Sequence, residues 1–268
     1  RGKEYDCISG LSGGMDSSYI ACIAKKLGLR TLLVHLDNGW DSELAVKNIE
    51  NIVKKTGFDY YNHVVDWEEF KDIQLSYFRA SVVDIEAITD HAIFALLYRK
   101  ANELNIKYIL GGNNYKTEWI MPQEGWAFSD KCFDLSNLLA IHKKFGKVKL
   151  RTFPTLGLLR QHYYTHIRGI KTVSFFDYLD LKMADVKRQL ESEFGWRDYG
   201  AKHGESVFTK FYQRYILHTK FNIDKRKGHL SSLICSGQIT REQALEKMKE
   251  ELYAEDELRE EYDYVIKK

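Results

Sequence analysis

The stretch SGLSGGMDSSYIACIAKKLG, residues 9–28, places a glycine pair, an aspartate and several serines between a hydrophobic segment and a helix. Residues 5–12 are typical of a strand, and apolar residues recur at helical spacing over 17–28, where Gly28 predicts the stop. Glycines let backbone amides approach a ligand, and the first turn of a helix offers unpaired N–H groups and a positive dipole end. This strand–loop–helix unit therefore predicts a cradle for phosphate oxygens.

The aspartate of this loop, Asp16, argues for more than an ordinary capped helix start. Serine and aspartate are good helix caps, but capping alone does not need a glycine pair, an aspartate and further serines together. A phosphate group repels a carboxylate inside its cradle unless a divalent cation bridges the two. The fingerprints G-x-x-x-x-G-K-[ST] and G-x-G-x-x-G of other nucleotide-binding loops are missing from the sequence. We expect these loop residues to contact the phosphates: Leu11, Ser12, Gly13, Gly14, Asp16, Ser17 and Ser18.

Strands and helices alternate along the first two thirds of the chain. This alternation predicts an α/β fold, a parallel sheet with helices on both faces. Ligands of such sheets bind beyond the carboxyl ends of the strands, so residues 12–18, 35–40 and 111–118 should meet in space. We expect further strands at 30–39, 59–66, 106–114 and 170–180, and helices at 42–57, 68–81 and 88–105.

The chain divides into two predicted parts. Residues 1–180 are expected to form the α/β domain, and residues 181–268 a helical C-terminal region. Residues 119–171 are less regular and mix aromatic with basic side chains. We interpret them as an insertion over the strand ends that selects the substrate. The stretch WAFSDKCFD, residues 126–134, is our candidate for part of that substrate pocket.

Composition excludes several classes of protein. The chain has 268 residues, of which 44% are hydrophobic, and a formal net charge of +2, so any phosphate or nucleic-acid site must be a local patch. Its four cysteines form no C-x-x-C pair, which indicates reduced thiols rather than a zinc or redox site. No apolar run approaches membrane-spanning length, and we expect a cytoplasmic protein that does not engage membranes. Because the first residue is Arg, we expect an upstream segment to be missing.

The motif SGGMDSS after a strand resembles the PP-loop of the ATP pyrophosphatases, whose fold is of the adenine nucleotide alpha hydrolase type. This family includes NAD, GMP and asparagine synthetases and tRNA-modifying enzymes. The resemblance implies that ATP is cleaved between its α and β phosphates, that AMP passes to a carbonyl oxygen and that pyrophosphate leaves. It also implies that Asp16 and Glu118 act in catalysis by holding Mg²⁺, and that His35 and Leu36 contact adenine largely through their backbone.

Other candidates near the strand ends have plainer alternatives. Gly111 and Gly112 would allow ATP to approach the fourth strand closely, with Asn113 beside the pyrophosphate or substrate. The residues 37–39 that follow His35 and Leu36 are equally consistent with a plain turn. Glu118 could be an ordinary capping or ion-paired residue. Asp90 could be only a helix cap, although the family places ligand-facing residues near its helix.

A second resemblance is narrower and spans nearly all of the chain. Residues 201–248, together with GGNNYKTEW at 111–119, are similar to the bacterial N-acetyl sugar amidotransferases of lipopolysaccharide and related surface-glycan biosynthesis. This resemblance implies that the acetyl oxygen of a nucleotide-linked sugar is adenylylated and then replaced by ammonia, which gives an acetamidino sugar. It further implies that a separate glutamine amidotransferase subunit supplies the ammonia.

A basic stretch within residues 206–229 is compatible with more than one acceptor for AMP, either a sugar or tRNA. Such a run is usually a solvated face, but its interleaved aromatics and family likeness favour a catalytic Lys210, with Lys225 and Arg226 neutralising pyrophosphate or a substrate diphosphate. The same patch could instead bind tRNA, as in a tRNA-modifying enzyme of the thiolase or lysidine-synthase type. We prefer the sugar acceptor and therefore predict no nucleic-acid partner. A non-catalytic adenine-nucleotide module is the other alternative. The amphipathic tail could serve a homodimer interface.

Overall fold

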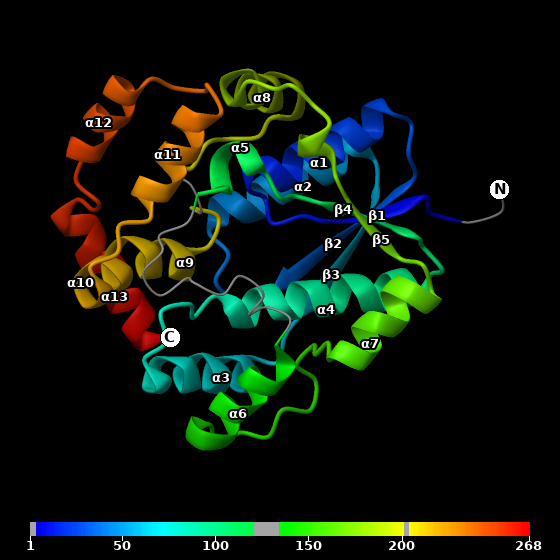
Figure 1. Cartoon of the computed structure of the whole chain (residues 1–268), viewed down its shortest axis with the longest axis horizontal. Helices are drawn as coiled ribbons and strands as arrows, with labels where there is room; N and C mark the ends of the chain where they lie inside the picture. The colour runs from blue at the N-terminus through cyan, green and yellow to red at the C-terminus, as the bar shows by residue number, and fades with distance from the viewer. Residues whose placement is uncertain (1–3, 121–133, 201–203) are drawn as a thin grey trace.

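Five strands form one parallel sheet in the order β3-β2-β1-β4-β5 (Figure 1). The computed structural model describes residues 4–120, 134–200 and 204–268. Every pairing within the sheet is parallel, which confirms the predicted fold class. The fifth strand is shorter than the predicted 170–180, because Phe175–Asp177 turn into a 3-10 helix. The strands are β1 (Cys7–Gly10), β2 (Thr31–Asp37), β3 (Asp59–Val64), β4 (Tyr108–Gly111) and β5 (Lys171–Ser174).

Helices cover both faces of the sheet, as the alternation of strands and helices predicts (Figure 1). Successive strand residues point to opposite faces, so Leu32 joins the core on one side while Leu33 joins the core on the other. One face is covered by α1 (Met15–Lys26), α2 (Glu43–Thr56), α8 (Met183–Gln189) and η4 (Leu190–Phe194). The other is covered by α3 (Trp67–Ala80) and α4 (Ala87–Glu103).

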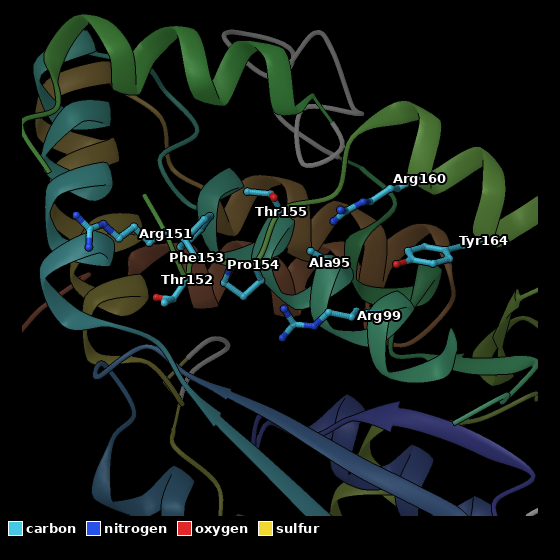
Figure 2. Close-up of a pocket in the computed structure, with 9 residues that line it drawn as sticks. All are labelled: Ala95, Arg99, Arg151, Thr152, Phe153, Pro154, Thr155, Arg160 and Tyr164. Atoms are coloured by element: carbon cyan, nitrogen blue, oxygen red, sulfur yellow. The ribbon is translucent and has the colours of Figure 1, made fainter. Parts of the chain in front are cut away.

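Residues 134–170 pack on the outer side of α3 and α4, which differs from the predicted insertion over the strand ends. They contain α6 (Leu135–Phe145), α7 (Leu158–His162) and η2 (Tyr163–Ile167). Figure 2 shows Pro154 and Thr155 beside Ala95 of α4. Most of the candidate pocket stretch 126–134 lies outside the described residues.

Two buried carboxylates on α3 hold this segment in place. Asp72 accepts hydrogen bonds from the amides of Lys147 and Val148 at 2.7 and 2.9 Å, and pairs with Nε2 of His142 at 3.0 Å. Burial raises the pKa of Asp72, but these donors outweigh burial, so its pKa lies below the usual value. Glu69 accepts from three successive amides, those of residues 151–153. Satisfying these buried charges fixes the segment on α3.

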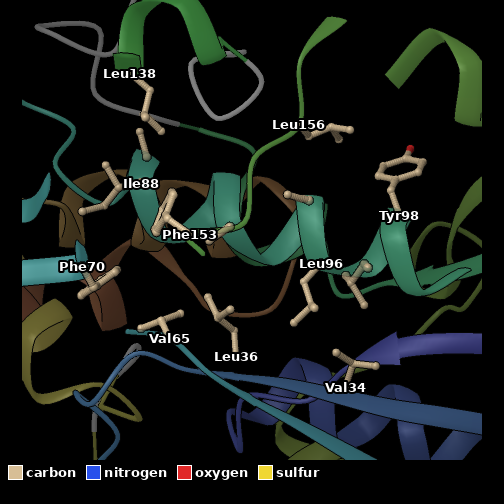
Figure 3. Close-up of a cluster of buried hydrophobic side chains, with 14 of the residues drawn as sticks. Val34, Leu36, Val65, Phe70, Ile88, Leu96, Tyr98, Leu138, Phe153 and Leu156 are labelled. Atoms are coloured by element: carbon tan, nitrogen blue, oxygen red, sulfur yellow. The ribbon is translucent and has the colours of Figure 1, made fainter. Parts of the chain in front are cut away.

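The larger core lies between β2 and α4 (Figure 3). Val34 and Leu36 of β2 face Leu96 of α4, and Phe153 and Leu156 of the docked segment close the far side. These side chains are all at most 8% exposed, and burial of each stabilises the fold by about 1.5–3 kcal/mol. The docked segment is therefore part of the folded core rather than a loose loop.

The C-terminal region is helical, as predicted; its α8 and η4 cover a face of the sheet, whereas residues 205–268 lie beyond the carboxyl ends of the strands (Figure 1). Residues 40–42 pair with residues 205–207 through an isolated bridge between Asp41 and Ser206, which ties this region to the end of β2. Among the helices within the described ranges, none combines the length and apolar character needed to cross a membrane. The helices are α9 (Val207–Phe211), η5 (Tyr212–Ile216), α10 (Leu217–Phe221), α11 (Arg226–Cys235), α12 (Arg241–Lys249) and α13 (Glu255–Lys267).

Candidate nucleotide-binding site

The glycine pair, Gly13 and Gly14, is separated from the end of β1 by two residues and leads into α1. Gly13 has a φ of +80°, and a Cβ atom there would lie 2.6 Å from the carbonyl oxygen of Ala45 on α2. Only glycine fits such a position, because the left-handed backbone and the close helix both exclude a side chain. The glycine is thus needed to pack the loop on α2, in addition to any approach by a ligand.

A clamp from residues 196–199 holds the carbonyl of Gly13. The Trp196 indole N–H donates to this oxygen at 2.8 Å and the Tyr199 hydroxyl donates at 2.5 Å. Asn48 of α2 fixes the clamp in turn, because its side chain exchanges two hydrogen bonds of 2.8 Å with the backbone of Arg197. Sequence reasoning missed this clamp, and the aromatic pair after Gly195 was the available signal.

Serine hydroxyls close the loop on itself. The hydroxyls of Ser12 and Ser17 lie 3.1 Å apart, and the amide of Gly14 donates to Ser12 Oγ at 3.3 Å. Ser17 also donates to the carbonyl of Gly14 at 3.2 Å. Ser18 is fully buried and does not line the cavity that lies between this loop and the C-terminal helices. The loop therefore offers Ser12 and Ser17, but not Ser18, to a ligand in that cavity.

A cavity of about 660 Å³ lies between this loop and the C-terminal helices. It brings together the loop, the short helix α5 (Tyr115–Glu118) and the basic stretch, which are far apart in the sequence. The predicted site residues that line it are Ser12, Gly14, Asp16, Ser17, Glu118, Lys210, Lys225 and Arg226.

Asn114 connects the two carboxylates predicted to share a metal ion. Its side-chain amide donates to Asp16 Oδ1 at 2.9 Å, and its side-chain oxygen caps α5 by accepting from the amide of Lys116 at 3.1 Å. Glu118 lies on that same short helix. The first turn of α1 and α5 are thereby locked together, with both carboxylates on one cavity.

This donor set fits an ion shared with phosphates. Within the described ranges, no group of three or more His, Cys, Asp or Glu side chains is arranged to hold a metal ion. Mg²⁺ is commonly held by one or two carboxylates plus substrate phosphates, and Asp16 and Glu118 provide that number. The residues therefore suit a Mg²⁺–ATP complex better than a resident structural metal.

Comparison with protein families identifies the two ends of the chain. Residues 6–113 match the family described as asparagine synthase. Residues 205–268 match the family described as LPS biosynthesis protein WbpG-like, C-terminal domain. The chain carries a WbpG-like C-terminal domain. Both sequence resemblances are confirmed at this level, and the cavity lies where the two matched regions meet.

Three solved structures resemble this chain at low identity. One is NMN synthetase from Francisella tularensis, 16% identical with a TM-score of 0.37, covering 76% of this chain and 88% of that one. A second is a predicted subunit of tRNA methyltransferase from Methanocaldococcus jannaschii, 18% identical with a TM-score of 0.36, covering 70% of this chain and 76% of that one. A third is NH3-dependent NAD synthetase from Campylobacter jejuni, in complex with the nitrate ion, 14% identical with a TM-score of 0.36, covering 90% of each chain. A comparison with curated protein sequences gave no match.

Two basic residues of the WbpG-like domain are neutralised by neighbouring carboxylates. The ammonium group of Lys210 pairs with Glu257 at 2.5 Å and with Glu261, and its side chain is only 16% exposed. The guanidinium of Arg226 pairs with Asp224 at 2.8 Å. Burial raises the pKa of Asp224, but its hydrogen bonds and ion pair with Arg226 lower that pKa by more. Lys210 and Arg226 thus line the cavity with their charges already paired, and their predicted role in neutralising pyrophosphate or a substrate diphosphate stays a prediction.

Glu205 of the WbpG-like domain reaches the loop, which sequence reasoning missed. Its Oε1 atom would lie 3.1 Å from a Cβ atom built on Gly14, and its side chain lines the cavity. The backbone of Glu205 is fixed because its carbonyl accepts from the amide of Ser42 at 2.8 Å. The signal was present in the stretch HGES at 203–206, which lies within the residues that we interpreted only for their family likeness.

The predicted adenine residues have buried side chains that do not line this cavity. His35 contacts the carbonyl of Leu11 through Nδ1 and Asp41 through Nε2, each at 2.8 Å. The carbonyl of Leu11 can only accept, so Nδ1 donates to it, while Nε2 faces the carboxyl group of Asp41. Burial lowers the pKa of His35, but the hydrogen bond and charge of Asp41 outweigh burial and raise it. The His35 side chain thus supports the start of the loop, and Leu36 belongs to the core.

Several other predicted contacts also lie away from the cavity. Gly111 packs against β5, where a Cβ atom would meet Thr172 at 3.1 Å. The carbonyl of Asn113 accepts from the hydroxyl of Ser174 at 2.9 Å. Asp90 is exposed in the first turn of α4. The residues not brought to this cavity are Leu11, Gly13, Ser18, His35, Leu36, Asp90, Gly111, Gly112 and Asn113.

Proposed function

We propose that the protein is an ATP-dependent, AMP-forming amidotransferase that converts the N-acetyl group of a nucleotide-linked sugar to an acetamidino group. The observation that carries this proposal is the single cavity between the loop of Ser12–Ser17 and the WbpG-like domain. The match to asparagine synthase supports the activation step, and the match to lipopolysaccharide-biosynthesis proteins supports a sugar acceptor.

In the first step, the acetyl oxygen attacks the α-phosphorus of ATP. The bond between that phosphorus and the bridging oxygen breaks, pyrophosphate leaves, and the amide nitrogen releases its proton to solvent as the amide becomes an O-adenylyl imidate. The first-turn amides of α1 and the hydroxyls of Ser12 and Ser17 bind the phosphate oxygens as charge moves onto pyrophosphate. The clamp on Gly13 keeps these donors in place, so little reorganisation is needed.

Asp16 and Glu118 would hold Mg²⁺, which supplies positive charge to the phosphate oxygens. Asn114 orients Asp16 by donating a hydrogen bond to its Oδ1 atom. Groups that orient a ligand in this way are worth about 10–100-fold in metal affinity or activity. Asn114 is thus a positioning residue of the proposed site.

In the second step, ammonia attacks the imidate carbon and the carbon–oxygen bond to AMP breaks. The nitrogen releases a proton and remains on the carbon as the acetamidino group. Activation is required because an amide oxygen is a poor leaving group, whereas AMP is a good one. We propose that a separate glutamine amidotransferase subunit supplies the ammonia and that the WbpG-like helices bind the sugar.

The test incubates the protein with Mg-ATP, ammonium and a panel of UDP-linked N-acetyl sugars. We expect AMP and pyrophosphate to form only with an acceptor sugar, whose mass falls by the difference between O and NH. ADP as the product, or AMP formation only with tRNA, would contradict the proposal. Nucleotide binding without turnover under every condition would instead indicate a non-catalytic module.

A further inference from the structure

A second cavity, of about 190 Å³, lies on the outer side of α4. Among the described residues that line it, none also lines the loop cavity and none is acidic. We propose that it is a binding site for the phosphate group of a small anion. Its lining residues are Ala95, Arg99, Arg151, Thr152, Phe153, Pro154, Thr155, Arg160 and Tyr164.

Two guanidinium groups face this cavity. Figure 2 shows Arg99 of α4 and Arg160 of α7 reaching toward Pro154 and Thr155, whereas Arg151 points away. Arg160 forms no ion pair with any residue in the described ranges. Arg99 has only a long contact of 3.8 Å, from Nε to Glu103 Oε1 on the same helix. The two charges are therefore available to an anion.

The walls of the cavity are fixed before any ligand arrives. Glu69, only 5% exposed, accepts from the amides of residues 151–153, and the amide of Leu156 donates to Nε2 of His91 at 3.0 Å. The segment between these anchors carries Thr152 and Thr155. Tyr164 is stacked on Tyr98 with ring centroids 6.1 Å apart, and its hydroxyl points to the same space (Figure 2). A preformed wall spares the ligand the cost of ordering it.

The groups around the cavity favour phosphate over carboxylate. Each guanidinium offers a planar fork of N–H donors that matches phosphate oxygens, and the hydroxyls of Thr155 and Tyr164 add further donors. A carboxylate has two oxygens and would leave part of this donor set unused. The volume is below the roughly 300–1,000 Å³ of typical small-molecule pockets, so only the phosphate group itself is enclosed. Inorganic phosphate and a phosphate monoester share this chemistry.

Calorimetric titration of the full chain with inorganic phosphate tests the site. Saturating α,β-methylene ATP and Mg²⁺ occupy the loop cavity during one series and are omitted from another. We expect one phosphate to bind in both series, and the double variant Arg99→Gln/Arg160→Gln to bind at least about tenfold more weakly. Arg241→Gln, an exposed arginine on α12, is the matched control and should bind like the parent chain.

Three results would overturn the proposal. These are parent-like binding by the double variant, competition by the ATP analogue for the same phosphate, and equal binding of acetate. A parallel titration with glycerol phosphate distinguishes inorganic phosphate from a phosphate monoester as the natural ligand. The monoester should bind more tightly if the natural ligand extends beyond the cavity. If the double variant unfolds, the single variants Arg99→Lys and Arg160→Lys test the site instead. They keep the positive charge but lose the planar fork of N–H donors, so parent-like phosphate binding by both would also contradict the site.

Discussion

The two cavities differ in how their basic side chains are partnered. In the loop cavity, Lys210 and Arg226 are held by carboxylates of their own domain. In the cavity on α4, Arg99 and Arg160 face the space with no close acidic partner among the described residues. If the proposed function holds, the loop cavity would bind phosphate through backbone amides, hydroxyls and a shared cation. The α4 cavity would bind it through guanidinium groups.

Gly13→Ala should have the largest effect, and only on the loop cavity. The new Cβ atom would meet the carbonyl of Ala45 at 2.6 Å in a left-handed backbone, which should cost about 2–5 kcal/mol of unfolding free energy. Chemical denaturation measures the loss, and ATP-analogue binding should fall with it. Phosphate binding at the α4 cavity should persist in the folded fraction. Gly28→Ala, at a positive φ with open space around it, is the matched control for backbone strain alone.

Lys210→Met tests whether the lysine of the loop cavity is mainly structural. Removing the cation leaves Glu257 and Glu261 together without their partner, and we expect a loss of about 1–3 kcal/mol in stability. Pyrophosphate release by the folded variant should fall less than about tenfold, since a direct transition-state contact is worth about 10²–10³-fold. A rate loss of that larger size with unchanged stability would show that Lys210 acts directly on the phosphates.

Trp196→Phe should weaken the clamp while preserving the aromatic packing. The variant removes the indole donor to the carbonyl of Gly13, which Tyr199 still contacts. We expect a loss of about 1 kcal/mol in stability and weaker binding of the ATP analogue. Trp119→Phe, at an exposed tryptophan, is the control. Unchanged binding of the ATP analogue by Trp196→Phe would show that the clamp does not support nucleotide binding.

Acid should loosen the segment that forms the wall of the α4 cavity by protonating Asp72. Near neutral pH this change in stability should be the smallest effect of the series. The pKa of Asp72 is lower in the folded chain than in the unfolded chain. The stability it contributes is therefore present above its unfolded pKa of about 3.9 and is lost as pH falls through the lower folded value. Hydrogen exchange of residues 147–156 should report this loss. In Asp72→Asn that step should be absent, and its persistence would place the titration elsewhere.

Periodicity and topology predicted much of the fold and the meeting of Asp16 with Glu118. The carboxyl ends of parallel strands share one edge, so loops after β1 and β4 had to be neighbours. The side chains of His35 and Leu36 are buried in β2, so the predicted adenine contact through their backbone stays a prediction. Nothing local in the sequence announces that Glu69 and Asp72 bind amides some 75–84 residues away, and these bonds decide where residues 134–170 dock.

The clamp and Glu205 were missed for a related reason. Trp196 and Tyr199 donate to a carbonyl 183 and 186 residues earlier, and such side chain-to-backbone contacts leave no periodic trace. The ion pairs of Lys210 were likewise hidden, since its carboxylates come from α13, which we interpreted only as part of an amphipathic tail. Sequence therefore predicted which loops converge, while the partners of individual side chains depended on tertiary packing.

The central claim is that the loop with Asp16 and the WbpG-like domain form one site for AMP-forming activation. Its most direct test is acceptor-dependent pyrophosphate release by the parent chain, by Asp16→Asn and by Asp177→Asn, whose carboxylate is exposed outside the cavity. We predict sugar-dependent release by the parent and by Asp177→Asn, and a loss of at least about 10²-fold in Asp16→Asn. Undiminished release in Asp16→Asn would contradict the account.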